Sequence, residues 1–386
     1  MVHFASGRLG SERTLKIAIF GLTISSSWGN GHATPYRAIL RALARQRHRI
    51  SFFEKDVPYY ALRRDFTACD FCDLFLYSSW DQIRPIARNV VAECDAVIFA
   101  SYCPDGARII DDIIEIPGPK KLFYDLDTPI TFSNLISGDL DYLRRDQIPL
   151  FDMYLSFTGG RILDELATEW GAQEAHPLYG CVDPEVHARV PANDHFRCDL
   201  SYMGTYAADR QQKLEELFLA PAQELPFRQF VLAGSMYPWE MEFPPNVRRI
   251  EHVAPSDHPV LYSSSRATLN ITRNEMARFG YCPSGRFFEA AACGTPIISD
   301  WFEGLDTFFE TGWANPELIL ASNTREVIAA LSRSDHELRE IAGRARRRTL
   351  SEHTGERRAE DLIHYIEESM SKRRGPQLFT AKGEVA

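Results

Sequence analysis

Apolar residues along the chain follow two patterns that alternate with each other. Short apolar runs typical of buried strands occur at residues 15–21, 50–54, 96–101, 121–127 and 153–157. After the first run and a polar loop, apolar residues at helical spacing predict a helix, with Thr34 as its N-cap and Pro35 in its first turn. Strands that alternate with helices predict a parallel sheet covered by helices.

A turn-rich segment that contains Pro177, Gly180 and Pro184 interrupts this pattern. Strand-like runs then resume at residues 200–204, 229–234, 247–252, 268–272, 296–299 and 318–321. We therefore predict an α/β fold of two Rossmann-like domains with a cleft between them. The predicted first domain spans residues 15–176, a linker spans 177–197, and the second domain spans 198–352. A helix at 353–370 is predicted to cross back onto the first domain. A disordered N-terminal tail (1–14) and a polar tail (371–386) complete the chain.

The composition is that of a soluble globular protein. Of the 386 residues, 45% are hydrophobic and 25% are charged, and the apolar runs stay short of the ~20 residues that a transmembrane helix needs. Residues 1–14 also lack the apolar core of a signal peptide, so we expect a cytoplasmic protein. The eight cysteines do not suggest a disulfide framework, and Cys69 and Cys72 are interpreted as buried thiols and not as a metal site.

The net charge of −10 argues against a protein that binds nucleic acid. Positive charge gathers between residues 344 and 358, where six arginines lie close together in the sequence. We interpret them as a solvated helix face, although a peripheral contact with a membrane stays open. The oligomeric state is not determined by these patterns.

The most informative segment is residues 283–299. Ser284 is placed to cap a short helix, Gly294 to end it, and a strand follows at once. The free backbone N–H groups at such a helix start, next to Gly285, favour a phosphate group. Arg286 and Glu289 share one face of this helix, which suits a cation at the phosphates and a carboxylate at two ribose hydroxyls. A local Arg–Glu surface pair is the alternative.

This segment resembles the donor-binding motif of GT-B glycosyltransferases. The motif has a glutamate followed by small residues, a glycine and a proline, and here it is Glu289-Ala-Ala-Ala-Cys-Gly294-Thr-Pro296-Ile-Ile. The resemblance implies that Glu289 holds the ribose of a nucleotide sugar. Further segments are similar to the CgeB-like branch of these enzymes: residues 270–273, 284–294, 300–304 and 353–358. Residues 180–184 resemble the crossover between the two GT-B domains, and residues 202–206, with Gly204, resemble the phosphate-side loop of the second.

One position departs from the pattern of the resembled family. Many retaining GT-B enzymes have a second glutamate eight positions before the ribose glutamate, and here that position is Tyr281. Glu275 lies nearby at the wrong spacing. The usual contact to the donor sugar is therefore missing or supplied elsewhere, and both the sugar and the choice between inversion and retention stay open.

The first domain offers a glycine-containing loop after its first strand. Gly29 and Gly31 would let the backbone approach a ligand. The loop lacks the G-x-G-x-x-G pattern, which disfavours a nicotinamide enzyme. His32, at the end of the loop, is a candidate general base or phosphate contact; the alternative is a polar residue that faces solvent at a helix start.

Two further charged residues follow predicted strands, whose carboxyl ends are where open α/β sheets bind ligands. Asp127 is the candidate base or charge-stabilising carboxylate, with an N-cap role as the alternative. Arg273 is expected to neutralise a departing diphosphate together with Arg286, unless it forms a structural salt bridge. Asp125 and Asp127 also spell the Asp-x-Asp metal signature of another glycosyltransferase fold, but we predict no metal site and no cofactor besides the donor.

The leading hypothesis is the transfer of a sugar from a nucleoside diphosphate, bound by the second domain, to an unknown acceptor, bound by the first. A nucleotide-sugar epimerase or phosphorylase of the same fold is a second hypothesis. A third hypothesis is a protein that binds a nucleotide sugar without turning it over. The presence of Tyr281 in place of the glutamate would fit such a protein.

Overall fold

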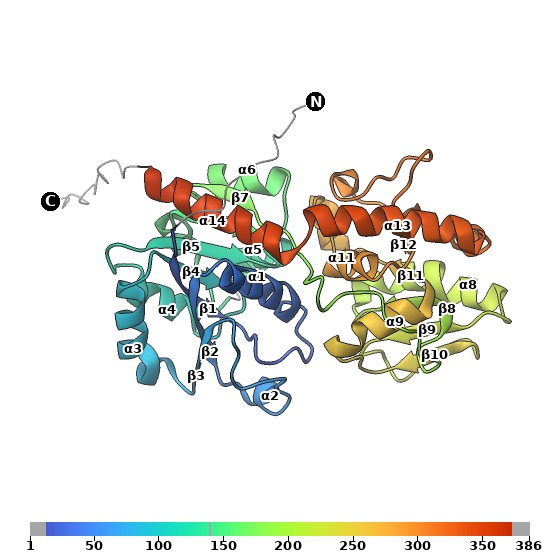
Figure 1. The fold of residues 1–386 in the computed structure, drawn as a ribbon, viewed down its shortest axis with the longest axis horizontal. Coiled ribbons are helices and arrows are strands. Elements are labelled where there is room, and N and C mark those ends of the chain that lie inside the picture. Colours follow the sequence, from blue (N-terminus) through green and yellow to red (C-terminus); the bar gives the residue numbers. More distant parts are fainter. Residues whose placement is uncertain (1–12, 139, 373–386) are drawn as a thin grey trace.

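The computed structural model describes residues 13–138 and 140–372, which form two α/β lobes side by side (Figure 1). The first lobe is built on a parallel sheet of order β3-β2-β1-β4-β5-β6-β7. Its strands are β1 Lys16–Gly21, β2 Arg49–Lys55, β3 Asp73–Tyr77, β4 Ala96–Ala100, β5 Lys120–Asp125, β6 Met153–Ser156 and β7 Ala175–Pro177. Its helices are α1 Ala33–Arg45, α2 Pro58–Ala61, α3 Trp80–Ala92, α4 Gly106–Ile113, α5 Thr128–Ser137 and α6 Arg161–Thr168.

The second lobe repeats this plan with a parallel sheet of order β10-β9-β8-β11-β12-β13. Its strands are β8 Cys198–Met203, β9 Phe230–Ala233, β10 Val247–Ile250, β11 Ser265–Asn270, β12 Ile297–Ser299 and β13 Ile319–Leu320. Its helices are α7 Gln211–Leu214, α8 Ala220–Glu224, α9 His258–Ser264, α10 Asn274–Phe279, α11 Gly285–Ala292, α12 Thr324–Leu331 and α13 Asp335–Glu352. The predicted fold class, two Rossmann-like domains, is confirmed.

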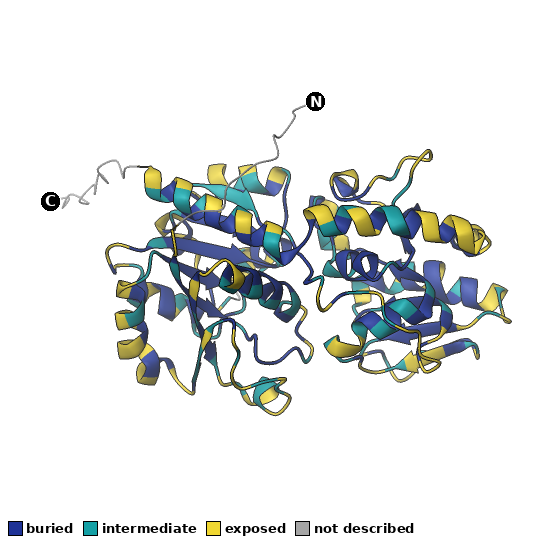
Figure 2. Cartoon of the chain, viewed as in Figure 1, coloured by how far each residue is buried: buried dark blue, intermediate teal, exposed yellow. Residues whose placement is uncertain are grey.

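Both sheets are buried on their two faces, as all-parallel sheets must be. Figure 2 shows that the central strands are buried along their length, whereas most outer helices are buried on one side only. In the first lobe, alternate residues of β1 belong to separate apolar clusters: Ile17 and Ile19 to one, Ala18 and Phe20 to the other. Each sheet therefore has a core above it and a core below it.

In both sheets the strand order reverses at the first strand, between β1 and β4 and between β8 and β11. Loops that leave neighbouring strands at this point run in opposite directions and leave a crevice at the carboxyl ends of the strands. The loop after β1 and the loop after β8 are the segments in which sequence analysis placed Gly29, Gly31 and Gly204. The two crevices thus define where a ligand has room.

The connection between the lobes is made of two crossings of the chain, which meet in a parallel β-bridge between Val182 and Thr354. β7 ends at Pro177 and β8 begins at Cys198, and between them Val182 exchanges backbone hydrogen bonds with the junction of α13 and α14. The N–H of Val182 donates to His353 (3.0 Å), and the N–H of Gly355 donates to Val182 (2.8 Å). Helix α14, Gly355–Ser371, then lies against α1 of the first lobe and completes its core (Figure 1).

Two details differ from the sequence prediction. Helix α1 begins at Ala33, so Thr34 is inside the helix and is not its N-cap, although Pro35 is in the first turn. The side chain of Asn30 organises this loop by accepting from the N–H of His32 (3.1 Å) and donating to two loop carbonyls. Strands β3 and β7 were not predicted: β7 is three partly buried residues with a weak apolar pattern, and the apolar run of β3 at residues 74–77 was overlooked. The predicted tails lie mostly outside the described residues.

Candidate functional site

Two adjoining cavities, of about 350 and 600 Å³, lie between the lobes. Both are lined by Gly31 and Thr34 from the first lobe and by the N-terminal half of α11 from the second. The structure brings every predicted site residue to the wall of one or both cavities: Gly29, Gly31, His32, Asp127, Gly204, Arg273, Ser284, Gly285, Arg286 and Glu289. A ligand that fills this cleft would therefore touch both domains.

The start of α11 is built as a phosphate site would be. Ser284 caps the helix, because its Oγ accepts from the N–H of Arg286 (3.4 Å). A Cβ added to Gly285 would meet no atom within 4 Å, so glycine leaves open space there. Within the described part of the chain, Arg286 and Glu289 form no ion pair with each other; Glu289 instead pairs with His258. The alternative of a local surface pair is therefore not what the structure shows.

Three guanidinium groups face the same cavity: Arg210, Arg273 and Arg286. Arg210 is 7% exposed, and its Nε makes no hydrogen bond to the described residues. Burial lowers the pKa of Arg210, and the charges of Arg286 and Arg273 add to this effect, so the three cations repel one another. Within the described residues, Arg273 forms one ion pair, a long one with Asp209 (3.6 Å). An anion between these groups would relieve their repulsion.

Sequence reasoning missed Arg210. It lies just before α7, six residues after Gly204, and so belongs to the helix start that follows the first strand of the second domain. A cation at that point could have been noted from its position alone, because parallel strands deliver such helix starts to the cleft. Lys213, three residues on, does not add to the free charge, because Asp300 neutralises it at 2.6 Å.

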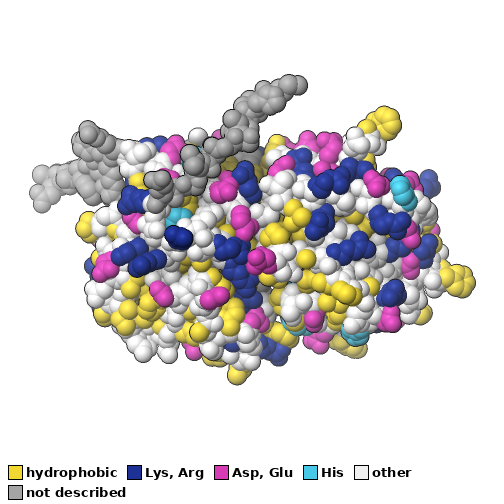
Figure 3. Space-filling model, viewed as in Figure 1, with side chains coloured by type: hydrophobic (Ala, Val, Ile, Leu, Met, Phe, Trp, Pro, Cys, Tyr) yellow, Lys and Arg dark blue, Asp and Glu magenta, His cyan; other side chains and the backbone are white. Residues whose placement is uncertain are grey.

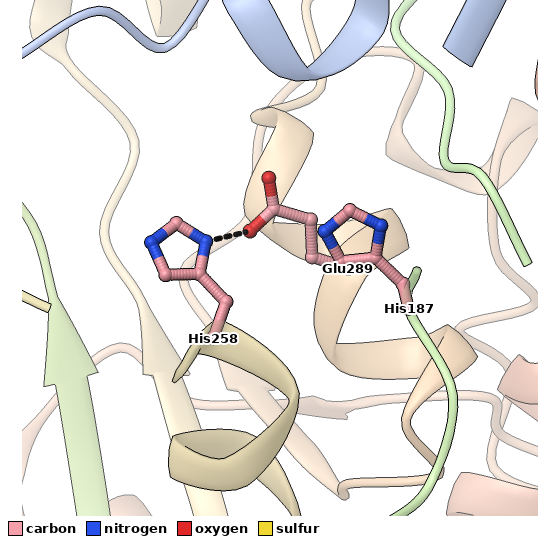
Figure 4. Close-up of side chains that lie close together, drawn as sticks. All are labelled: His187, His258 and Glu289. Carbon is pink, nitrogen blue, oxygen red and sulfur yellow. Dashed lines mark hydrogen bonds and ion pairs between the residues drawn. The ribbon is translucent and has the colours of Figure 1, made fainter. Parts of the chain in front are cut away.

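Glu289 lies at the junction of the two cavities and is 7% exposed. Its Oε2 is 3.1 Å from Nδ1 of His258, and the ring of His187 lies on its other side (Figure 4). Burial raises the pKa of Glu289, but the hydrogen bond from His258 and the charges of His258, His187 and Arg286 outweigh it and hold the pKa below its usual value. The carboxylate is thus ionised and able to accept hydrogen bonds from hydroxyl groups.

Asp127 follows β5 and occupies the position before α5, but its side chain does not cap that helix. Its carboxylate accepts instead from the hydroxyl of Tyr102 (2.8 Å). Burial raises the pKa of Asp127, and Tyr102 and Arg273 offset part of this rise. The N-cap alternative therefore does not describe this side chain, which faces the 350 Å³ cavity.

His32 is half-buried, and its Nδ1 is enclosed with no hydrogen-bond partner among the described residues. Its ring packs at 5.2 Å from the ring of Tyr102, which also holds Asp127. Burial lowers the pKa of His32 to about 4, so the imidazole is neutral at pH 7. His32 faces the cavity, so the alternative of a solvent-facing polar residue at the helix start does not describe it.

Asp125 does not share the cleft with Asp127. It is fully buried at the end of β5 and accepts hydrogen bonds from Tyr154 (2.6 Å), Thr131 (2.9 Å) and the N–H of Asp127 (3.0 Å). Burial raises its pKa to about 6, against the effect of these donors. The Asp-x-Asp pair thus comprises one structural carboxylate and one that faces the cleft, an arrangement that does not suit a shared ion.

Tyr281, at the position of the missing glutamate, joins the two lobes. Its backbone has a positive φ of 47°, and its ring lies against Gly160 of the first lobe and Gly304 of the second. Its carbonyl accepts from the N–H of Gly159 (3.0 Å). Within the described chain, neither Tyr281 nor Glu275 lines the two cavities. This position therefore serves domain contact and not the donor sugar.

The arginines between residues 344 and 358 are largely engaged with the protein itself. Arg344, Arg346 and Arg348 donate to backbone carbonyls of the second lobe, and Arg357 and Arg358 pair with acidic residues of α14. On the face drawn in Figure 3, basic and acidic side chains are mixed over the surface. Among the described residues, no helix combines the length and the apolar character that crossing a bilayer would require.

Comparison with known proteins supports this architecture. A family model described as glycosyl transferase-like matches residues 210–364. No curated protein sequence matches the chain. An alpha-glucosyltransferase in complex with UDP-glucose and DNA has a TM-score of 0.67 at 14% identity, over 92% of this chain and 100% of its own. Sucrose-phosphate synthase from Thermosynechococcus elongatus has a TM-score of 0.62 at 12% identity, over 93% and 99%.

A third similar structure is HepE from Anabaena in complex with UDP and glucose, with a TM-score of 0.61 at 12% identity, over 92% of this chain and 100% of its own. These likenesses span both lobes. The chain therefore has the GT-B fold, with two parallel-sheet domains and a C-terminal helix that crosses back.

Proposed function

We propose that this protein is a glycosyltransferase that moves a sugar from a nucleoside-diphosphate donor to an acceptor held by the first domain. The observation that carries the proposal is that an ionised carboxylate and three arginines lie along one wall of the cleft, where the arginines have few acidic partners among the described residues. Glu289 would accept from the ribose hydroxyls, and Arg210, Arg273 and Arg286 would surround the diphosphate. The glycosyl transferase-like model that covers this segment and the UDP held by similar structures support the assignment.

Charge that develops on the leaving diphosphate needs fixed positive groups in the transition state. The start of α11 and the three arginines supply them without a divalent ion. The carbonyl of Thr205 holds Arg210 and the carboxylate of Asp209 lies near Arg273, so both guanidinium groups are oriented before a donor binds. UDP-glucose is the first donor to test, because similar structures hold it.

The acceptor hydroxyl must lose a proton as it attacks, or shortly afterwards. Asp127 and His32 both face the cavity from the first domain, opposite the arginines. Asp127 is the stronger candidate, since its carboxylate is held by Tyr102 and turned toward the cleft. A negative charge there would also stabilise positive charge that develops on the sugar ring in the transition state.

We expect the protein to release UDP from UDP-glucose, and to do so faster with an acceptor, in the presence of excess chelator. Chromatography of the nucleotide products against a panel of acceptor sugars, with EDTA in all samples, measures this. The arginines make a metal ion unnecessary for donor binding, so chelator is expected to leave the rate unchanged.

Other results would point to other functions. An epimerised nucleotide sugar without UDP release would indicate an epimerase. Donor binding without any turnover, across several donors and acceptors, would indicate a regulatory or scaffolding protein. Activity that EDTA abolishes and magnesium or manganese restores would contradict the proposed role of the arginines.

A further inference from the structure

Three side chains from separate segments converge at the wall of the cleft. His187 lies in the linker between β7 and β8, His258 begins α9, and Glu289 is on α11 (Figure 4). One ligand-type atom from each, two imidazole nitrogens and one carboxylate oxygen, lie within 4.8 Å of one another. The binding of a nucleotide uses Glu289 but gives no role to a pair of histidines around it.

His187 is the unexpected member of this cluster. It is 4% exposed, and neither of its ring nitrogens has a hydrogen bond of normal geometry to the described residues. Burial lowers the pKa of the ring, while Glu289 and the nearby backbone carbonyl of Asp183 raise it in part. A buried imidazole without partners is costly.

We propose that His187, His258 and Glu289 form a binding site for a divalent transition-metal ion of the zinc type. Two imidazoles and one carboxylate make up a donor set that zinc uses when a fourth position is left open. His258 and Glu289 line the 600 Å³ cavity, which gives the ion an entry path and leaves room for a water as fourth ligand. The 3.1 Å separation of His258 Nδ1 and Glu289 Oε2 is close to that of two ligands on one zinc ion.

The ion and the nucleotide would exclude each other, because both use the carboxylate of Glu289. This competition rests on the proposed function, whereas the metal site itself does not. Zinc would thus lower the affinity for the donor and slow transfer, and it would take no part in the reaction. The site is distinct from Asp125 and Asp127, at which no cation is expected.

The metal site is tested by titrating zinc chloride into the full-length, metal-free protein in a calorimeter, without nucleotide. We expect one zinc ion per chain, and loss of this binding in His258→Gln and in His187→Gln. His252→Gln is the matched control, because His252 lines the same cavity outside the cluster. Cobalt absorption in the visible range, with the bands of a four-coordinate ion, gives a second readout that requires no activity.

Cys69 and Cys72 need their own control, since their sulfur atoms are 3.2 Å apart and thiols bind zinc. Zinc binding is expected to survive Cys69→Ser/Cys72→Ser. Zinc that still binds to His258→Gln, or that is lost from the serine variant, would overturn the proposal. His258 is only partly buried, so its variant tests the site even where His187→Gln fails to fold.

The competition is tested by titrating UDP at several zinc concentrations. The apparent Kd for UDP is expected to rise in proportion to zinc in the native protein and to stay constant in His258→Gln. Simultaneous binding of UDP and zinc would show that they do not share Glu289. Native protein that binds UDP but no zinc would refute the metal site alone and leave the proposed function intact.

Discussion

Replacing Asp127 by asparagine is expected to slow sugar transfer by roughly 100- to 10,000-fold, with donor affinity almost unchanged. The amide keeps the shape of the side chain and can still accept from Tyr102, which lies 2.8 Å from the carboxylate. It cannot accept a proton, and it carries no charge to stabilise a developing cation. Initial rates and the Kd for the donor, measured on the same preparation, separate the two effects.

The matched control is Asp141→Asn, an exposed aspartate of the same domain outside both cavities. It is expected to transfer at the parent rate. Tyr102→Phe keeps the ring against His32 and removes the hydroxyl that orients Asp127, so an intermediate loss of rate is expected. Asp127→Asn with the parent rate would assign the carboxylate a structural role and leave His32 as the candidate base.

Replacing Arg210 by methionine is expected to lower the rate of transfer by roughly 100- to 1,000-fold, the effect of losing one preorganised donor to a developing charge. Arg210 is buried beside Arg273 and Arg286, and its Nε is unpaired among the described residues. Methionine has a similar length and no charge. Because it ends the repulsion among three cations, the free protein is expected to be no less stable than the parent.

Transfer kinetics and thermal unfolding of the free protein together check this prediction. Arg278→Met is the control, since Arg278 is an exposed arginine on α10 that does not line the cavities. A large loss of stability in Arg210→Met would mean that the guanidinium holds the fold, through its bond to the Thr205 carbonyl, and not the diphosphate. Unchanged transfer in a folded variant would remove Arg210 from the site.

The fold was predictable because the strands of parallel sheets are buried on both faces, so their apolar runs stand out in the sequence. The runs at residues 15–21 and 96–101 correspond to β1 and β4 at the centre of the first sheet. The edge strand β7 was missed because its three partly buried residues form no apolar run, whereas the run of β3 at residues 74–77 is present in the sequence and was overlooked. The start of α1 was missed by two residues, since a side chain of the preceding loop, Asn30, sets it.

The candidate site was predictable where its residues follow strand ends or share one helix, as Asp127, Arg286 and Glu289 do. Their proximity follows from the direction of parallel strands and from helical spacing. The partners of Glu289 were not predictable. His187 lies 102 positions and His258 lies 31 positions before Glu289 in the sequence. Only the packing of the linker and α9 against α11 brings the three residues together. The role of Tyr281 likewise depends on a contact between domains.

The central claim is that the cleft binds a nucleoside diphosphate with its ribose on Glu289. The most direct test is to titrate UDP, in the presence of EDTA, into the native protein and into Glu289→Gln in a calorimeter. The glutamine keeps the shape but loses the charge. We predict that the native protein binds UDP and that the variant binds it more weakly by ~1–3 kcal/mol, the usual cost of an unpaired polar partner. Glu275→Gln, outside the cavities, is predicted to bind as the parent does. Equal affinity of native protein and folded Glu289→Gln for UDP, or no binding of UDP by the native protein, would contradict the account.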